Sequence, residues 1–169
     1  MKTTANLFAR RALAYFVDGL VMLLVTNLLI AIPTAWFGRI SPQAHACLSV
    51  VTVVLTAIYY VGAHWRFGRT IGKAIVGLRV IGVRDQKVSL AEAAIRYLPF
   101  FIGAAGFAVS DMLGLSLTHV RIRGEEIEVL SIVFAAWVIA EIIVALLNKG
   151  SRSIHDIFAH TRVIDPKSA

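Results

Sequence analysis

The stretch Ala12–Phe37, ALAYFVDGLVMLLVTNLLIAIPTAWF, decides the fold of this chain. Its apolar run is longer than the roughly 20 residues that a helix needs to cross the hydrocarbon core of a bilayer. Asp18 is the only charged residue within it, and Arg11 stands directly before it. An ionisable side chain inside a span costs at least a few kcal/mol, so it usually faces other helices and serves a function. The stretch therefore predicts an integral membrane protein with a buried carboxylate.

The rest of the chain has a similar composition. Its 169 residues are 58% hydrophobic with a mean hydropathy of +0.77, whereas soluble domains are nearer to half apolar. The excess falls in four blocks, residues 12–37, 44–63, 97–118 and 129–147, each about as long as a span. We therefore expect an all-α membrane protein, a four-transmembrane-helix bundle that forms one domain over residues 1–169.

Positive charge is concentrated in alternate connections of this bundle. Fourteen of the 17 lysines and arginines lie in residues 1–11, 64–96 and 148–169, while Arg39, Arg121 and Arg123 lie in the other two connections. Such alternation is the positive-inside pattern. It predicts a multi-pass protein whose N- and C-termini and central loop are cytoplasmic. The net charge of the whole chain is +7, and the concentration of its basic residues on this face favours anionic lipid head groups as partners and argues against nucleic acid.

The central loop, residues 64–96, is long enough to contain structure of its own. Its residues Ile71, Ala74, Ile75 and Leu78 fall on one face at helical spacing, with Lys73 near the edge of that face. This pattern predicts a short amphipathic helix on the membrane surface. Tyr59, Tyr60 and Trp65, just before the loop, are typical of an aromatic belt at the membrane interface.

Two short β-branched runs predict a small β element on the same side of the membrane. Residues 79–81 in the central loop and 162–164 in the tail both have the sequence RVI, and we expect them to pair. Each run is next to a capping box, Ser89–Glu92 and Ser153–Asp156 respectively, which predicts that a helix begins there.

Two intramembrane carboxylates are predicted at nearly equal depth. Glu141 precedes Lys149 by eight residues, which places it about 12 Å from the cytoplasmic face, and Asp18 follows Arg11 by two helical turns, or about 10 Å. If their helices touch, the like charges would favour a shared proton, which suits proton or cation exchange. A structural role stays open, in which each carboxyl stays protonated or pairs with Arg11, Arg96 or a backbone group and orients helices.

Other candidate chemistry is weaker. His155 and His160 are five residues apart, whereas side chains three or four apart share a helical face, so we expect no metal and no cofactor. His64 lies at a predicted membrane edge, where histidine is ordinary. Cys47 is the only cysteine and cannot form an intramolecular disulfide. Because no nucleophile and base are paired convincingly, an enzyme is not expected.

Three separated motifs point to a known family. They are RALAYFVD at Arg11–Asp18, GRTIGK at 68–73 with GLRV at 77–80 and Arg96 beyond it, and IHD at 154–156 followed by TRV at 161–163. Together they resemble the RDD family of bacterial membrane proteins, which is named for one arginine and two aspartates. The resemblance implies that Asp156 is the second aspartate. Arg69 departs from it, since glutamine is common there, and a fourth span with Glu141 exceeds the minimal core of the family.

The resemblance implies a bacterial inner-membrane protein and transport, with cation/proton antiport suggested for some members. We predict the movement of a small cation or solute coupled to protonation of Asp18, with Glu141 as a second group, in a homo-oligomer. The alternative is a non-transporting assembly or accessory protein that binds partner helices or anionic lipids. The charged residues assigned to the transport site are Arg11, Asp18, Glu141 and Asp156, followed by Asp111, Lys73 and Arg96.

Overall fold

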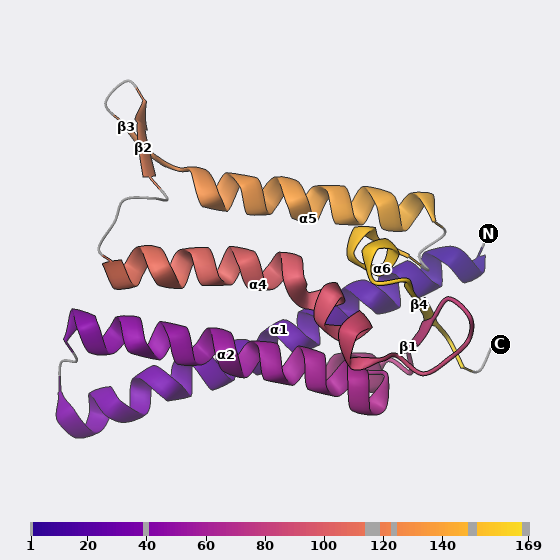
Figure 1. The fold of residues 1–169 in the computed structure, drawn as a ribbon, viewed down its shortest axis with the longest axis horizontal. Helices are drawn as coiled ribbons and strands as arrows, with labels where there is room; N and C mark the ends of the chain where they lie inside the picture. The colour runs from indigo at the N-terminus through magenta and orange to yellow at the C-terminus, as the bar shows by residue number, and fades with distance from the viewer. Residues whose placement is uncertain (1, 39–40, 114–118, 123–124, 149–151, 167–169) are drawn as a thin grey trace.

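The computed structural model describes residues 2–38, 41–113, 119–122, 125–148 and 152–166, without the side chains of residues 2–5, 42, 111, 119–122, 125–128 and 130–131. Four long helices dominate the fold (Figure 1), and they are α1 (Lys2–Phe37), α2 (Pro42–Phe67), α4 (Leu90–Leu113) and α5 (Val129–Leu147). The shorter elements are α3 (Ile71–Ile75), β1 (Arg79–Gly82), β2 (His119–Ile122), β3 (Glu125–Glu128), α6 (Ile154–Phe158) and β4 (Thr161–Ile164).

Three of these helices are long and apolar enough to cross a membrane. The candidate spans are Asn6–Phe37, Gln43–Phe67 and Leu90–Ser110, so the first and third begin earlier than the predicted blocks. The described apolar part of α5, Ile132–Leu147, is shorter. A fourth span therefore stays a prediction, and residues 114–118 of the predicted third block lie outside the described residues.

The candidate spans in α1 and α2 turn their apolar side chains outward. Only 6% of the most apolar part of each is buried, and Leu24 and Ile58 are 62% and 63% exposed. Soluble proteins rarely expose contiguous apolar patches larger than a few hundred Å². These surfaces are what a lipid environment requires, in agreement with the membrane protein that the sequence predicts.

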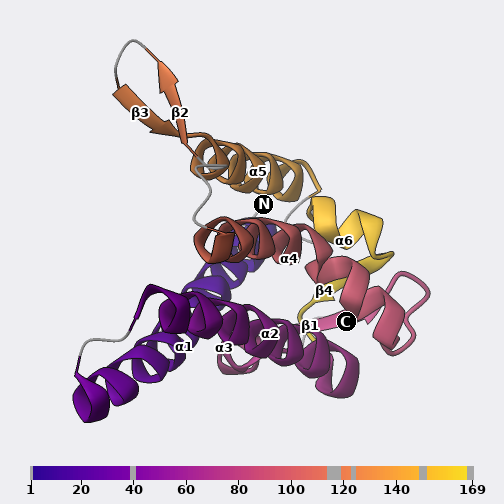
Figure 2. The same cartoon turned by 60° about the vertical axis from the view of Figure 1, so that its left-hand side comes forward.

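The long helices share one end where the chain begins and finishes. The two termini, β1, β4 and α6 lie together at this end, which we call the terminal end, and β2 and β3 lie at the opposite end (Figure 1). Helix α4 lies between α2 and α5 in both views (Figure 2) and packs most extensively against α2. The predicted positive-inside arrangement requires the same side for both termini, and this geometry is compatible with it.

The predicted pairing of the two β-branched runs is confirmed. Strands β1 and β4 are antiparallel, with Val80 opposite Val163 and Ile81 opposite Arg162. The fully buried apolar residues gather around this small sheet, in a core of Leu78, Val80, Val88, Ala93 and Val163. The compact hydrophobic core thus lies at the terminal end, beside the spans.

Both predicted helix starts are also confirmed. Ser89 N donates to Glu92 Oε2 at 2.7 Å and Glu92 N donates to Ser89 Oγ at 3.2 Å, which fixes the first turn of α4. Ser153 N donates to Asp156 Oδ2 at 2.9 Å at the start of α6. Strands β2 and β3, by contrast, form an antiparallel hairpin where the sequence predicted only a loop between spans.

Candidate functional site

Asp156 lies at the centre of a buried ionic cluster at the terminal end. Arg11 Nη2 donates to its Oδ2 at 2.7 Å, and Arg96 Nη1 donates to its Oδ1. All three side chains are buried. Burial alone would raise the pKa of Asp156, but the charges of Arg96 and Arg11 hold it well below its usual range. The carboxylate is therefore ionised, and it neutralises part of the charge of both guanidinium groups.

The ionic cluster joins segments from both halves of the chain. Arg11 Nη2 also donates to Ser153 Oγ at 3.1 Å, and Arg96 Nη1 donates to Thr161 Oγ1 at 2.8 Å. The Ser153 hydroxyl in turn donates to Asp156 Oδ2 at 2.9 Å. Helices α1, α4 and α6 and strand β4 are thus held together by charge-assisted hydrogen bonds, which are the strong class.

Asp18 occupies a second buried site that fixes helix α3 against α1. Its carboxylate accepts hydrogen bonds from the Tyr59 hydroxyl at 2.8 Å, the Thr70 hydroxyl at 2.5 Å and Gly72 N at 2.8 Å. Ile71 N donates to the Tyr59 oxygen at 3.0 Å. Backbone N–H groups at the start of a helix have no partner within the helix. Asp18 and Tyr59 supply those partners and so hold the first turn of α3 against α1 and α2.

Gly72 permits a close contact between α3 and α1. A Cβ atom at this position would lie 2.1 Å from the carbonyl oxygen of Ala14 and 2.9 Å from Asp18 Cγ. Only glycine allows the two backbones to approach so closely. The close approach also turns the next residue, Lys73, into the interior of the protein.

Lys73 is the most unusual buried group of the molecule. It is 1% exposed, and its Nζ lies 4.6 Å from the centroid of the Tyr15 ring, in a cation–π contact. Burial and the nearby charge of Arg96 lower the pKa of Lys73 to about 7. The predicted short helix is present and the side chains of Ile71, Ala74 and Ile75 are exposed on it, but Lys73 is buried and does not lie near the edge of that face. Lys73 lies inward because its neighbour Gly72 forms the contact with α1.

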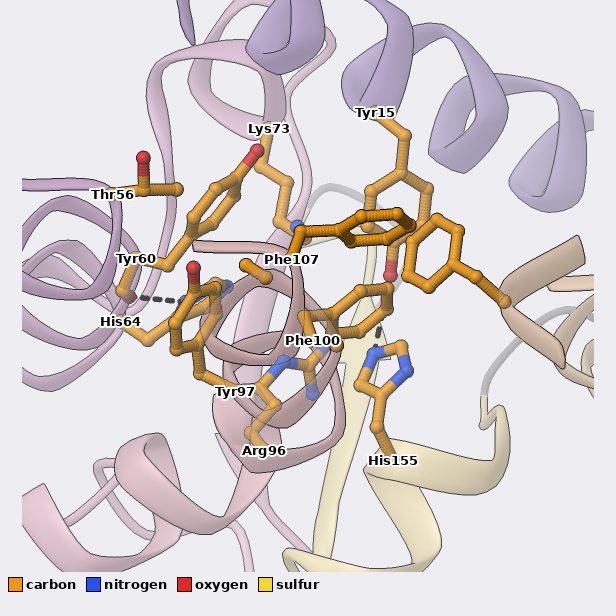
Figure 3. Close-up of a pocket in the computed structure, with 13 residues that line it drawn as sticks. Tyr15, Thr56, Tyr60, His64, Lys73, Arg96, Tyr97, Phe100, Phe107 and His155 are labelled. Atoms are coloured by element: carbon orange, nitrogen blue, oxygen red, sulfur yellow. Dashed lines mark hydrogen bonds between the residues drawn. The ribbon is translucent and has the colours of Figure 1, made fainter. Parts of the chain in front are cut away.

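A hydrogen-bonded chain runs from Glu141 through His155 to Tyr15. His155 Nδ1 donates to Glu141 Oε2 at 2.7 Å, and His155 N donates to Glu141 Oε1 at 3.0 Å. The Tyr15 hydroxyl lies 3.2 Å from His155 Nε2, which accepts because Nδ1 carries the proton (Figure 3). Burial lowers the pKa of His155, so the ring is neutral near pH 7. These three groups can pass a proton from one to the next.

A cavity of about 360 Å³ lies beside the hydrogen-bonded series formed by Glu141, His155 and Tyr15. Figure 3 shows its side chains, which come from all six helices. The lining residues are Tyr15, Thr56, Tyr60, His64, Lys73, Arg96, Tyr97, Phe100, Gly103, Ala104, Phe107, Phe134 and His155. Aromatic rings form most of the wall, and the nitrogen-bearing side chains supply its polar part. The volume is within the range of small-molecule pockets.

Two buried nitrogens of the cavity-lining residues lack a hydrogen-bond partner within the described part of the chain. They are Arg96 Nη2 and His64 Nε2. His64 Nδ1 donates to the carbonyl oxygen of Tyr60 at 2.7 Å, which leaves the lone pair of Nε2 as an acceptor. A buried polar group without a partner costs about 1–3 kcal/mol. Unsatisfied groups of this kind are more common at sites that bind a ligand than in inert cores.

The sequence-predicted site residues separate into two sets. The structure brings Arg11, Arg96 and Asp156 into one cluster. It also pairs Asp18 with the backbone N–H of Gly72, which is one of the structural alternatives that the sequence left open. It does not pair Asp18 with Glu141: Asp18 contacts α2 and α3, whereas Glu141 contacts α6. The expected shared carboxylate site is therefore wrong. The physical reason is that each carboxylate has nearer hydrogen-bond donors, at the start of α3 for Asp18 and on α6 for Glu141.

The sequence missed several residues of the site. His155 was dismissed on its spacing to His160 and His64 on its position at a predicted membrane edge, although each lines the cavity. Tyr15 had no assigned role. The only signal that pointed to them was their position within or beside the quoted motifs. Asp111 lies near the end of α4, and its side chain is outside the described residues. Within the described ranges no group of three or more His, Cys, Asp or Glu side chains is suited to a metal ion.

The fold and site define a class, that of helical membrane proteins whose central loop and tail close together over buried charges. The sequence model of the RDD family matches residues 5–160, and the chain belongs to this family. The match includes Arg11, Asp18 and Asp156, the three residues that the resemblance assigned to the family name. Comparison with curated proteins found no significant match, and neither did comparison with solved structures.

Proposed function

We propose that this chain is a multi-pass protein of the bacterial inner membrane that transports a small solute in exchange or in company with a proton. The observation that carries the proposal is the cavity, where a buried lysine lies beside a hydrogen-bonded chain. A titratable group in a cleft, with a perturbed pKa, is a candidate functional group. Lys73 has that character, because its pKa of about 7 lets it gain and lose a proton near neutral pH.

The proposed proton path has four members. Glu141 is bound to His155, His155 is bound to Tyr15, and the Tyr15 ring faces the Lys73 ammonium. Because Lys73 contacts the face of the Tyr15 ring, a proton on Lys73 would reach the Tyr15 hydroxyl through water in the cavity. From there it would pass through His155 to the carboxylate of Glu141. Glu141 keeps the coupling role that the sequence suggested, and Lys73 replaces Asp18 as the group that exchanges the proton.

The remaining charged residues serve the architecture in this proposal. Asp18 anchors α3 and so positions Lys73, because Gly72 and Thr70 both donate to its carboxylate. Arg11 and Asp156 close the tail over α1 and hold one side of the Arg96 guanidinium. Substitution of any of these should act through the position of Lys73 or Arg96, with no change in which group titrates.

The setting of the protein follows the sequence predictions. We propose four spans with α5 as the fourth, cytoplasmic termini, a basic face in contact with anionic lipids, and a non-enzymatic role. A homo-oligomer is also proposed, because four helices enclose little space for a path across the bilayer. The cytoplasmic termini and the basic face are supported by the charge distribution and by the common end of the two termini.

Flux in proteoliposomes tests the proposal. The purified chain is reconstituted in phosphatidylethanolamine and phosphatidylglycerol with internal pyranine, and gradients of sodium chloride, potassium chloride or sodium benzenesulfonate are applied. We expect at least one gradient to move protons. Glu141→Gln and Lys73→Met should each slow this flux by about tenfold or more, because they remove members of the proton path.

Asp18→Asn is the matched comparison. It should lower the amount of folded protein while the pH dependence of flux per folded molecule stays unchanged. If no gradient moves protons, and the chain is instead recovered stoichiometrically with a larger complex from native membranes, the transport proposal fails and the assembly or accessory role replaces it.

A further inference from the structure

The charge of the cavity wall separates candidate solutes. The described residues that line it include the basic side chains of Lys73, Arg96, His64 and His155 and no aspartate or glutamate. The three buried carboxylates nearby are already occupied by donors: Asp18 by Thr70 and Gly72, Asp156 by two arginines, and Glu141 by His155. A cation in the cavity would therefore meet Lys73 and the open side of Arg96, and the described residues that line the cavity offer it no carboxylate.

Lys73 and Arg96 both have N–H donors that remain available to a ligand in the cavity. The ammonium of Lys73 contacts the Tyr15 ring, and Arg96 Nη2 is buried without a partner among the described residues. The two cations are close enough for the charge of Arg96 to help lower the pKa of Lys73. An anion between them would relieve this repulsion and satisfy both donors, and charge-assisted hydrogen bonds of this type are short and strong.

The remainder of the cavity is apolar and aromatic. Tyr60 and Tyr97 stack with ring centroids 5.5 Å apart and an interplanar angle of 16°. Phe100 meets Phe134 edge to face at 6.3 Å. Such walls bind flat apolar groups through offset or edge contacts. The volume of about 360 Å³ is near the lower limit for ligand pockets, so it suits a molecule with one ring or a short chain.

We infer that the cavity binds a small organic acid whose acidic group lies between Lys73 Nζ and Arg96 Nη2 and whose apolar body lies against Tyr60, Tyr97 and Phe100. A hydroxyl group on the same molecule would find an acceptor in His64 Nε2. The inference deepens the proposed function, on which it rests, by naming the substrate class of the same cavity. It also gives the coupling a cause, because an anion beside Lys73 favours the protonated ammonium and therefore draws in a proton.

Calorimetric titration of the full chain in nanodiscs tests the inference with probes of matched shape. Benzenesulfonate is the anion, benzyl alcohol the neutral analogue and benzylammonium the cation. We expect benzenesulfonate to bind at least about tenfold more tightly than benzyl alcohol, and benzylammonium to be the weakest. Measurements at pH 8 in buffers of different ionisation enthalpy should show proton uptake on benzenesulfonate binding, because Lys73 is then largely neutral before binding. Tighter binding of benzylammonium than of benzenesulfonate would overturn the inference.

Two variants locate the site. Lys73→Met should weaken the binding of benzenesulfonate by about tenfold or more and abolish the proton uptake, while benzyl alcohol binds with unchanged affinity. Lys87→Met, the same change at an exposed loop position, should leave both ligands unaffected. Should Lys73→Met fail to fold, Ala104→Leu fills the cavity and keeps every charge, and it should abolish the binding of both ligands. Unchanged benzenesulfonate binding in a folded Lys73→Met or Ala104→Leu protein would overturn the assignment.

A third comparison identifies the source of the acid. Hexanoate and palmitate carry the same carboxylate, but one represents water-soluble acids and the other acids from the membrane. Either one displacing benzenesulfonate supports the anion site and assigns its source, whereas displacement by methyl palmitate would contradict the need for charge. The flux and binding experiments test the two proposals separately. Anion binding without proton movement would contradict the transport proposal and leave the anion site intact. Proton movement without selectivity for the anion would contradict the substrate class and leave the transport proposal intact.

Discussion

Asp156 and Lys73 are both fully buried charged residues, yet their surroundings differ completely. Asp156 accepts hydrogen bonds from two arginines, from Ser153 and from the backbone. Lys73 faces a cavity, and the interaction recorded for its ammonium within the described residues is with an aromatic ring. The comparison shows that burial alone does not identify a functional charged residue. A charge with all its partners inside the protein supports the fold, whereas a charge with an open side is available to a ligand.

The largest expected effect comes from removing the charge at the satisfied site. Asp156→Asn leaves Arg11 and Arg96 buried without their counter-ion, and breaking a buried ion pair in this way costs about 3–5 kcal/mol. Unfolding of the detergent-solubilised protein by denaturant measures the loss. The control is Asp85→Asn, which removes an exposed ion pair with Arg162 and should cost less than about 1 kcal/mol. Similar losses for both variants would show that the buried cluster has no special importance.

The second effect tests the contact that places Lys73 inside. Gly72→Ala puts a methyl group 2.1 Å from the carbonyl oxygen of Ala14, so α3 must move away from α1. Overpacking of this kind costs about 1–3 kcal/mol, and Asp18 should lose its bond to the Gly72 backbone. The same unfolding measurement applies. Gly19→Ala on α1 meets nothing within 4 Å and should stabilise the helix by about 0.5–1 kcal/mol, so the two glycines should differ in sign.

The third effect is a pH dependence that belongs to Lys73. Its folded pKa of about 7 lies below the ordinary value of 10.5, so between these limits the unfolded chain binds a proton that the folded chain does not. Stability should therefore rise with pH from about 7 to 10.5, by at most about 1.4 kcal/mol per pH unit, and stay constant with respect to this group below pH 7. Lys73→Met should remove this slope, whereas Lys87→Met should keep it. If the stability of Lys73→Met depended on pH with the same slope, the titrating group would be a residue other than Lys73.

The smallest expected change in stability separates the proton chain from the packing. Tyr15→Phe removes one hydroxyl from His155 Nε2 and preserves the ring beneath the Lys73 ammonium. The free energy of unfolding should fall by only about 0.5–1.5 kcal/mol. Proton flux should nevertheless slow by about tenfold, because the chain from Glu141 is interrupted. Flux at the rate of the unmodified protein would exclude Tyr15 from the path.

Much of the architecture could be predicted from local sequence patterns. The apolar blocks predicted the long helices, the capping boxes marked where α4 and α6 begin, and the repeated RVI sequence predicted the pairing of β1 with β4. These features depend on residues that are close in the sequence or on simple complementarity of two segments. The resemblance to the RDD family likewise came from contiguous motifs, and the family match confirms it.

The site was harder to predict because its partners come from distant segments. If helices α1 and α5 touched, Asp18 was expected to share a site with Glu141. Its donors instead include Gly72 N of α3. The position of α3 depends on the close backbone contact that Gly72 permits because it has no side chain. His155 was judged by its spacing to His160, although its actual partner is Glu141 on another helix. Periodicity describes one helix at a time. It contains no information on which face of a short loop helix contacts a long one.

The order of Arg11, Arg96 and Asp156 in the sequence has a consequence for biosynthesis. Arg11 and Arg96 are translated long before the carboxylate that they bind, so a nascent chain contains two guanidinium groups whose counter-ion has not yet emerged. Maturation is complete only when α6 docks. A copy that terminates prematurely after α5 would retain these two charges without their counter-ion and would therefore be less stable than a copy that contains α6.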